Sequence, residues 1–151
     1  MEFRKAKKED VVDIVKMLSD DELGAEREKY QQPLPQQYYD AFQKINDDIN
    51  QELMVVEDEK GEVIGTFQLS LITYLTYQGG IRYQIEAVRV RRDKRGQGIG
   101  KLMFKWAIER AKTSGAHVLQ LTTDKKRPDA IRFYENLGFN ATHQGMKIHF
   151  K

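Results

Sequence analysis

The sequence contains no cysteine and only three prolines among its 151 residues. The absence of cysteine excludes disulfides and a cysteine nucleophile, and it fits a reducing compartment, so we expect a cytoplasmic protein. No apolar run approaches the roughly 18–20 residues that a membrane-spanning helix needs. The residues that follow Met1 also lack the apolar stretch of a secretory signal, so we expect no membrane association.

A large net charge is also missing. The 25 basic and 23 acidic residues leave a formal net charge of +2. This balance argues against general nucleic-acid binding, which needs many uncompensated phosphate contacts. Local charge is uneven, because residues 89–95 hold five basic side chains and one acid, Asp93. Such a patch suits a small polyanion, although a solvated loop is the more common meaning of a charge run.

The length fits one domain, residues 1–151, with a single core. Hydrophobic periodicity predicts helices at 8–18, 37–50 and 129–137, and a strongly amphipathic helix between Gly98 and Ser114. Strands are predicted at 3–6, 53–57, 63–73, 81–90 and 117–122, followed by a closing hairpin of 139–143 and 146–150. This order indicates an α/β fold, with one mixed sheet and helices on both of its faces.

Strict alternation over 81–90 predicts two faces for this strand. One face would carry Ile81, Tyr83, Ile85 and Ala87, and the other Arg82, Gln84, Glu86, Val88 and Val90.

The segment that carries most chemical information is Arg95-Gly96-Gln97-Gly98-Ile99-Gly100, between a predicted strand and a predicted helix. Its glycines allow a tight turn and a close approach to a ligand. The helix that follows offers free N–H groups and the positive end of its dipole, an arrangement suited to a pyrophosphate. A Walker A loop is excluded because Leu102 follows Gly100-Lys101. A Rossmann loop is excluded because Lys101 and Met103 occupy the positions where its third glycine would fall.

The remaining pattern, Arg/Gln-x-x-Gly-x-Gly/Ala, resembles the coenzyme loop of the GNAT superfamily of N-acetyltransferases. A second segment, Ala130-Ile131-Arg132-Phe133-Tyr134-Glu135-Asn136-Leu137-Gly138-Phe139, is similar to the family's Ala-x-x-Phe-Tyr-x-x-x-Gly-Phe. The resemblance is strong from Gln84 to Phe139 and weak before Leu53. One departure is Arg127, where many members carry asparagine.

The resemblance implies a mostly antiparallel sheet whose fourth and fifth strands splay apart to hold acetyl-CoA, the acyl-donor substrate. The residues implied to bind it are Val88, Arg89, Val90, Arg95, Gly96, Gln97, Gly98, Ile99, Gly100 and Lys101. Within this set, the main chain of Val88–Val90 would pair with the pantetheine arm like an added strand. No metal is expected, because His117, His143 and His149 lack partner carboxylates at recognisable ligand spacing.

Direct acetyl transfer needs a base for the amine and an acid for the departing thiolate. Glu86 is the candidate base, acting directly or through water, although it could instead be a structural carboxylate paired with Arg82. Tyr134 is the candidate acid by resemblance, although it also lies in the apolar stripe of its helix and could be a core aromatic.

The sequence favours a small-molecule amine as the acceptor. Two alternatives stay open: acetylation of peptide N-termini or protein lysines, and a non-catalytic regulatory module that binds acyl-CoA. A homodimer is common for this architecture, but no interface is specified by the sequence.

Overall fold

The computed structural model describes residues 1–151 apart from the side chain of Pro128. Its helices are α1 (Val11–Ser19), α2 (Glu22–Arg27), α3 (Gln36–Asp47), α4 (Thr76–Gly79), α5 (Ile99–Thr113) and α6 (Pro128–Asn136), with 3-10 turns η1 (Lys8–Asp10) and η2 (Arg92–Lys94). Its strands are β1 (Glu2–Lys5), β2 (Gln51–Glu57), β3 (Val63–Thr73), β4 (Ile81–Val90) and β5 (Val118–Gln120).

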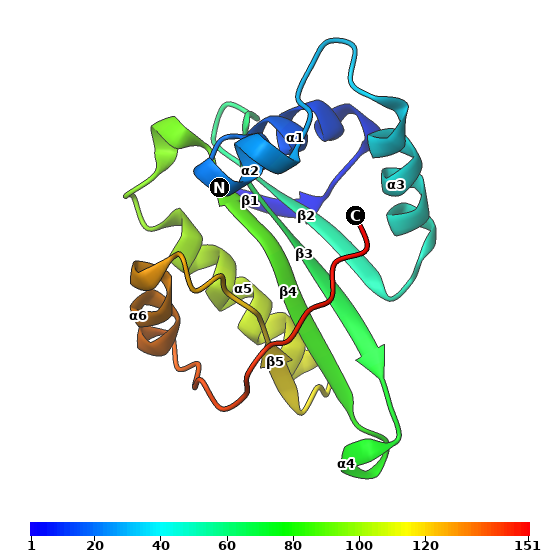
Figure 1. The fold of residues 1–151 in the computed structure, drawn as a ribbon, viewed down its shortest axis with the longest axis vertical. Coiled ribbons are helices and arrows are strands. Elements are labelled where there is room, and N and C mark those ends of the chain that lie inside the picture. The colour runs from blue at the N-terminus through cyan, green and yellow to red at the C-terminus, as the bar shows by residue number, and fades with distance from the viewer.

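The five strands form one sheet in the order β1-β2-β3-β4-β5 (Figure 1). Neighbours from β1 to β4 pair antiparallel, whereas β5 pairs parallel with β4. Parallel neighbours need a long crossover, which α5 supplies. The mixed, mostly antiparallel sheet predicted from the sequence is confirmed.

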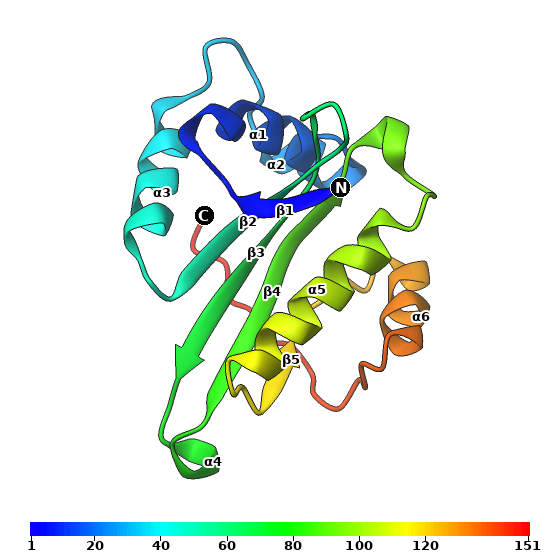
Figure 2. The same cartoon turned by 180° about the vertical axis from the view of Figure 1, so that it is seen from behind.

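Helices cover both faces of this sheet. On one face, Met103, Phe104 and Ala107 of α5 join Phe67 and Ile85 in a buried cluster, which we call the α5 core. On the other face, α1 and α3 pack over β2 through a second buried cluster that includes Val15, Phe42 and Val55. Figure 2 shows α5 and α6 on the near side of the sheet. None of the helices described in residues 1–151 is long and apolar enough to cross a membrane.

The predicted closing hairpin is wrong. Residues 139–151 have no strand in the described chain, and Met146, Ile148 and Phe150 are 92%, 81% and 92% exposed. Alternating apolar residues favour an extended backbone, but a strand also needs a neighbouring edge to pair with, which the alternation cannot supply. The segment instead crosses the face of the sheet opposite α5 (Figures 1 and 2).

Candidate active site

Strand β4 carries a β-bulge at Ala87, whose backbone φ is 54°. Gln68 of β3 pairs with Glu86, but Thr66, two residues earlier on β3, pairs with Arg89. Strand β4 therefore holds one extra residue between these two pairs, and an extra residue bends a strand and reverses its alternation of side chains.

The bulge corrects the predicted faces of β4. Val88 and Val90, predicted to share a face with Glu86, pack against the α5 core together with Ile85. Strict alternation fails because it assumes an uninterrupted strand. Alanine is also a rare residue at positive φ, so the sequence gives no sign of the bulge.

Strands β4 and β5 separate beyond a short paired stretch. Their pairing runs from Arg82–Gln84 on β4 to Val118–Gln120 on β5, whereas β4 itself continues to Val90. The predicted splay is therefore present, with Gln84 and Gln120 as the last pair at its apex. The residues 88–90 lie along the β4 wall of this wedge.

The glycine turn follows directly after β4 and η2. Gly96 and Gly98 have φ values of 77° and 82°, and a Cβ at either position would meet nothing within 4 Å. Gly98 is the N-cap of α5, so the first-turn N–H groups, which include those of Ile99, Gly100 and Lys101, have no partner within the helix. The turn is thus open and presents backbone donors, as an anion site requires.

At Gly100 the start of α5 lies close to both β4 and α6. A Cβ there would lie 3.9 Å from the ring of Phe133 and 4.0 Å from Val90. The anion site, the wedge wall and α6 therefore meet at this glycine.

Arg95 ties the turn to the corner between α1 and α2. Its Nε donates to the carbonyl oxygen of Val90 at 3.1 Å, and its Nη2 donates to the carbonyl oxygen of Asp20 at 3.1 Å. Arg92 also pairs with the carboxylate of Asp20. Gln97 Nε2 donates to the carbonyl oxygen of Asp93 at 3.5 Å, which closes the turn on itself.

Asp21 joins three elements that are distant in the sequence. Its Oδ1 accepts a hydrogen bond from the Gly24 N–H at 2.5 Å and so caps α2. Its Oδ2 lies 3.1 Å from Arg89 Nε on β4 and 3.1 Å from Arg127 Nη2 after β5. We call Asp21, Arg89 and Arg127 the Asp21 cluster.

The charged groups in the Asp21 cluster shift one another's pKa values. Burial would raise the pKa of Asp21, but the Gly24 N–H bond and the two arginines outweigh it and hold that pKa below its usual value. Burial lowers the pKa of Arg89, and the charge of Asp21 opposes that shift. The sequence prediction gave Arg89 only a main-chain role and named Arg127 only as a departure from the family pattern, and it did not predict that both pair with Asp21. The Asp21-x-x-Gly24 spacing of an N-cap was the available signal for Asp21.

Tyr134 lies on α6, half-buried beside the α5 core. Its ring centroid is 5.4 Å from that of Phe104 and 6.1 Å from that of Phe139. Burial raises the pKa of the Tyr134 phenol, while the charges of Arg127 and Arg89 act in the opposite direction. The phenol is therefore protonated at neutral pH, as a proton donor must be.

Glu86 is exposed and lies next to the bulge. Gln84 Nε2 donates to its Oε1 at 2.5 Å, whereas the alternative partner, Arg82, lies 5.0 Å over the ring of Tyr74. Gln84 was not predicted to have a role, because a glutamine two residues from a candidate base has no distinctive sequence signature.

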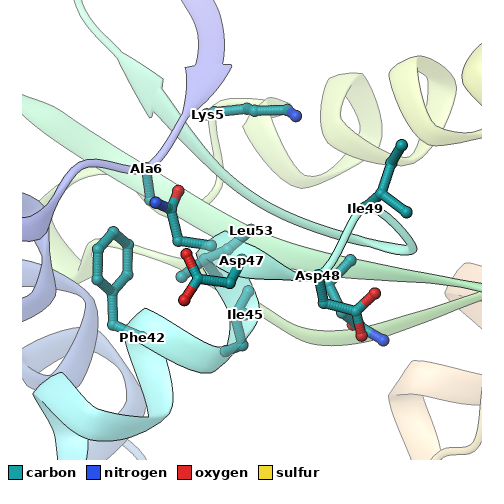
Figure 3. A pocket seen from close by; sticks show the side chains of 10 residues that line it. Lys5, Ala6, Phe42, Ile45, Asp47, Asp48, Ile49 and Leu53 are labelled. Carbon is teal, nitrogen blue, oxygen red and sulfur yellow. The ribbon is translucent and has the colours of Figure 1, made fainter.

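A cavity of about 270 Å³ lies at the end of α3, against β1 and β2 (Figure 3). Phe42, Ile45 and Leu53 line its apolar side, and Asp47 and Asp48 lie on its polar side. Neither Glu86 nor Tyr134 belongs to its lining, so we do not assign it to the reaction. Within the described chain, no group of three or more His, Asp or Glu side chains is arranged to hold a metal ion.

Comparison with known proteins identifies the class. The Acetyltransferase (GNAT) family matches residues 15–139, which contain the wedge, the glycine turn and Tyr134. The chain therefore belongs to the GNAT family, as its motifs predicted.

The alignments with individual curated relatives cover a smaller share of each protein. An aminoalkylphosphonate N-acetyltransferase of Salmonella typhimurium is 37% identical over 83 residues, which are 55% of this chain and 53% of that protein. An L-methionine sulfoximine/L-methionine sulfone acetyltransferase of Pseudomonas aeruginosa is 32% identical over 61% of this chain and 52% of its own. The chain thus matches about half the length of these curated relatives.

Solved structures match over nearly the whole chain. A protein described as a transcriptional regulator from Bacillus halodurans is 52% identical, with a TM-score of 0.95 and 99% of both chains covered. A glucosamine-6-phosphate N-acetyltransferase from Arabidopsis thaliana is 19% identical, with a TM-score of 0.79 and 99% and 98% coverage, and it shows the shared fold alone.

Proposed function

We propose that this chain is a cytoplasmic N-acetyltransferase that transfers the acetyl group of acetyl-CoA to the primary amine of a small molecule. The observation that carries the proposal is the continuous path from the glycine turn to the wedge. The turn offers N–H donors for a pyrophosphate, and β4 leads from it to Glu86 along an edge with which β5 does not pair.

The residues present fit the donor. The open side of Gly96 and Gly98 leaves room for a phosphate against the backbone, with Arg95 and Lys101 as nearby cations. No strand pairs with β4 at 88–90, so this edge can accept an extended pantetheine arm through main-chain hydrogen bonds, as strand addition does elsewhere. The arm would share the carbonyl oxygens of Val88 and Val90 with the side chains of Arg89 and Arg95. Acetyl-CoA supplies the activated thioester.

The proposed chemistry uses two protein groups. Glu86 accepts a proton from the acceptor ammonium, directly or through one water, so that the nitrogen lone pair can attack the thioester carbonyl. The new C–N bond forms as the C–S bond breaks, and Tyr134 gives its phenolic proton to the departing thiolate. The nitrogen, now acylated, loses its second proton, which restores the Tyr134 phenol, and Glu86 releases its proton to solvent. The sequence has no cysteine to form an acyl-enzyme, and direct transfer requires none.

A small acceptor is favoured by the names of the curated relatives, which act on aminoalkylphosphonates and on methionine sulfoximine or sulfone. The structural relative described as a transcriptional regulator favours the second candidate, a regulatory module that binds acyl-CoA without turnover.

The test is a thiol-release assay with acetyl-CoA over a panel of aminoalkylphosphonates, amino acids, polyamines and short peptides. Release of one thiol per acetylated small amine supports the proposal. Turnover on peptides alone would transfer the assignment to peptide acetylation. Coenzyme binding without turnover on any amine would favour the regulatory module.

A further inference from the structure

The last paired residues before β4 and β5 separate are connected by their side chains. Gln120 Nε2 donates to Gln84 Oε1 at 2.9 Å, and these two residues face each other across the strands. Gln84 Nε2 in turn donates to Glu86 Oε1 at 2.5 Å. A line of hydrogen bonds therefore runs from β5 through the apex of the wedge to the candidate base.

The direction of each hydrogen bond in this line is determined. An amide has a carbonyl oxygen at one end and an NH₂ group at the other, and its network decides which way it points. The Glu86 carboxylate can only accept a hydrogen bond, so the NH₂ group of Gln84 faces it and the Gln84 oxygen is left to accept from Gln120 Nε2. The bond from Gln120 thus holds the oxygen of the Gln84 amide, which would otherwise be held by Glu86 alone.

A neighbouring set of amides on the same sheet is built differently. Gln51 Oε1 accepts hydrogen bonds from Gln68 Nε2 and from Ser70 Oγ, both at 2.8 Å. Gln51 pairs with Ser70 across β2 and β3, and Ser70 pairs with Gln84 across β3 and β4, so Gln51 lies in the same cross-strand row as Gln84. The Gln51 amide forms no hydrogen bond with Gln84 or Glu86. It provides a matched control for the loss of one glutamine amide.

We propose that Gln84 is a positioning residue for Glu86 and that Gln120 anchors the Gln84 amide. The donated N–H holds the carboxylate beside the bulge, where the two walls of the wedge part. This inference rests on the proposed function, in which Glu86 is the base.

The experiment measures kcat, the KM of the amine and the affinity for acetyl-CoA for Gln84→Met, Gln120→Met and Gln51→Met, with Glu86→Gln as the reference. Methionine keeps the length of glutamine and removes its donor. Gln84→Met is expected to lower kcat about 10-fold and to leave acetyl-CoA affinity unchanged, since a hydrogen bond that positions a charged group is lost. Gln120→Met should lower kcat less, and Gln51→Met should leave it unchanged.

The outcomes separate the two proposals. If Glu86→Gln keeps wild-type turnover at every pH, the assignment of the base fails, and the positioning role fails with it. If Glu86→Gln loses turnover while Gln84→Met keeps the wild-type kcat, the positioning role alone is overturned. Acetyl-CoA affinity and melting temperature, measured for every variant, identify a variant that has lost its fold. In that case Gln84→Glu, which also lacks the NH₂ donor, replaces it, and its kcat should fall at least as far.

Discussion

Backbone geometry defines one side of the wedge, and side chains define the other. The proposed coenzyme side, from Ala87 to Lys101, is defined by backbone: a bulged strand, a turn with two positive-φ glycines and a helix N-terminus. The proposed acceptor side is defined by side chains from two strands, in the Gln120–Gln84–Glu86 line. The Asp21 cluster ties β4 to the segment after β5. The glycine turn and the start of α5 are encoded locally, whereas the bulge and the convergence of side chains depend on the whole fold. Substitutions on the acceptor side should therefore have little effect on acetyl-CoA binding.

The largest expected effect tests this independence. Glu86→Gln removes the proposed base and should lower kcat by about 100-fold, within the range for general base catalysis. Its acetyl-CoA affinity should stay within about twofold of the wild type, because the glycine turn is untouched. Thiol-release kinetics and calorimetry measure the two quantities. Equal losses in both would show that the two sides are not separable.

The next largest effect is expected for the Asp21 cluster, which spans both walls of the wedge. Asp21→Ala should lower the free energy of unfolding by about 2 kcal/mol, from the lost cap and the unpaired arginines. Asp21→Asn keeps the cap and removes only the charge, so it should cost less. Urea unfolding of the three proteins measures both losses.

The cost of Asp21→Asn should also depend on pH. The pKa of Asp21 is lowered in the folded state, so its charge stabilises the fold above the ordinary pKa of about 3.9. That contribution disappears as the pH falls through the lowered pKa. The difference in unfolding free energy between wild type and Asp21→Asn should therefore shrink below about pH 4. A difference that is constant from pH 7 to pH 3 would show that the charge is not responsible.

Tyr134→Phe should have a smaller effect on turnover than Glu86→Gln. A thiolate is a good leaving group, so the loss of its proton donor should lower kcat by about 10-fold. The ring stays in place against Phe104, and the melting temperature should hardly change. Unchanged kcat would assign Tyr134 to core packing.

The smallest effect compares two glycines of the turn. Gly98→Ala should cost about 1 kcal/mol of stability, because its φ of 82° is unfavourable for any side chain. Gly100→Ala has room for its methyl group at 3.9 Å from Phe133 and gains helix propensity, so stability should hold or rise. Thermal unfolding of both variants measures the two changes in stability. Equal losses of stability would mean that the positive φ of Gly98 does not define the turn.

The same contrast explains what the sequence could predict. The order of the main elements up to α6, the splay and the glycine turn follow from periodicity, from turn residues and from the family resemblance, and the structure confirms them, whereas the closing hairpin was wrong. The bulge at Ala87 was not predictable, because a single residue with φ of 54° changes the faces of Val88 and Val90 without a change in pattern. The Asp21–Arg127 pair joins residues 106 positions apart, a distance over which single-sequence patterns carry no contact information.

The most direct test of the account is a calorimetric titration of acetyl-CoA into the wild-type chain and into Glu86→Gln. The account predicts one site per chain and closely similar affinities for both proteins. Failure of the wild-type chain to bind acetyl-CoA would contradict the assignment of the glycine turn and the wedge, and with it the proposed function.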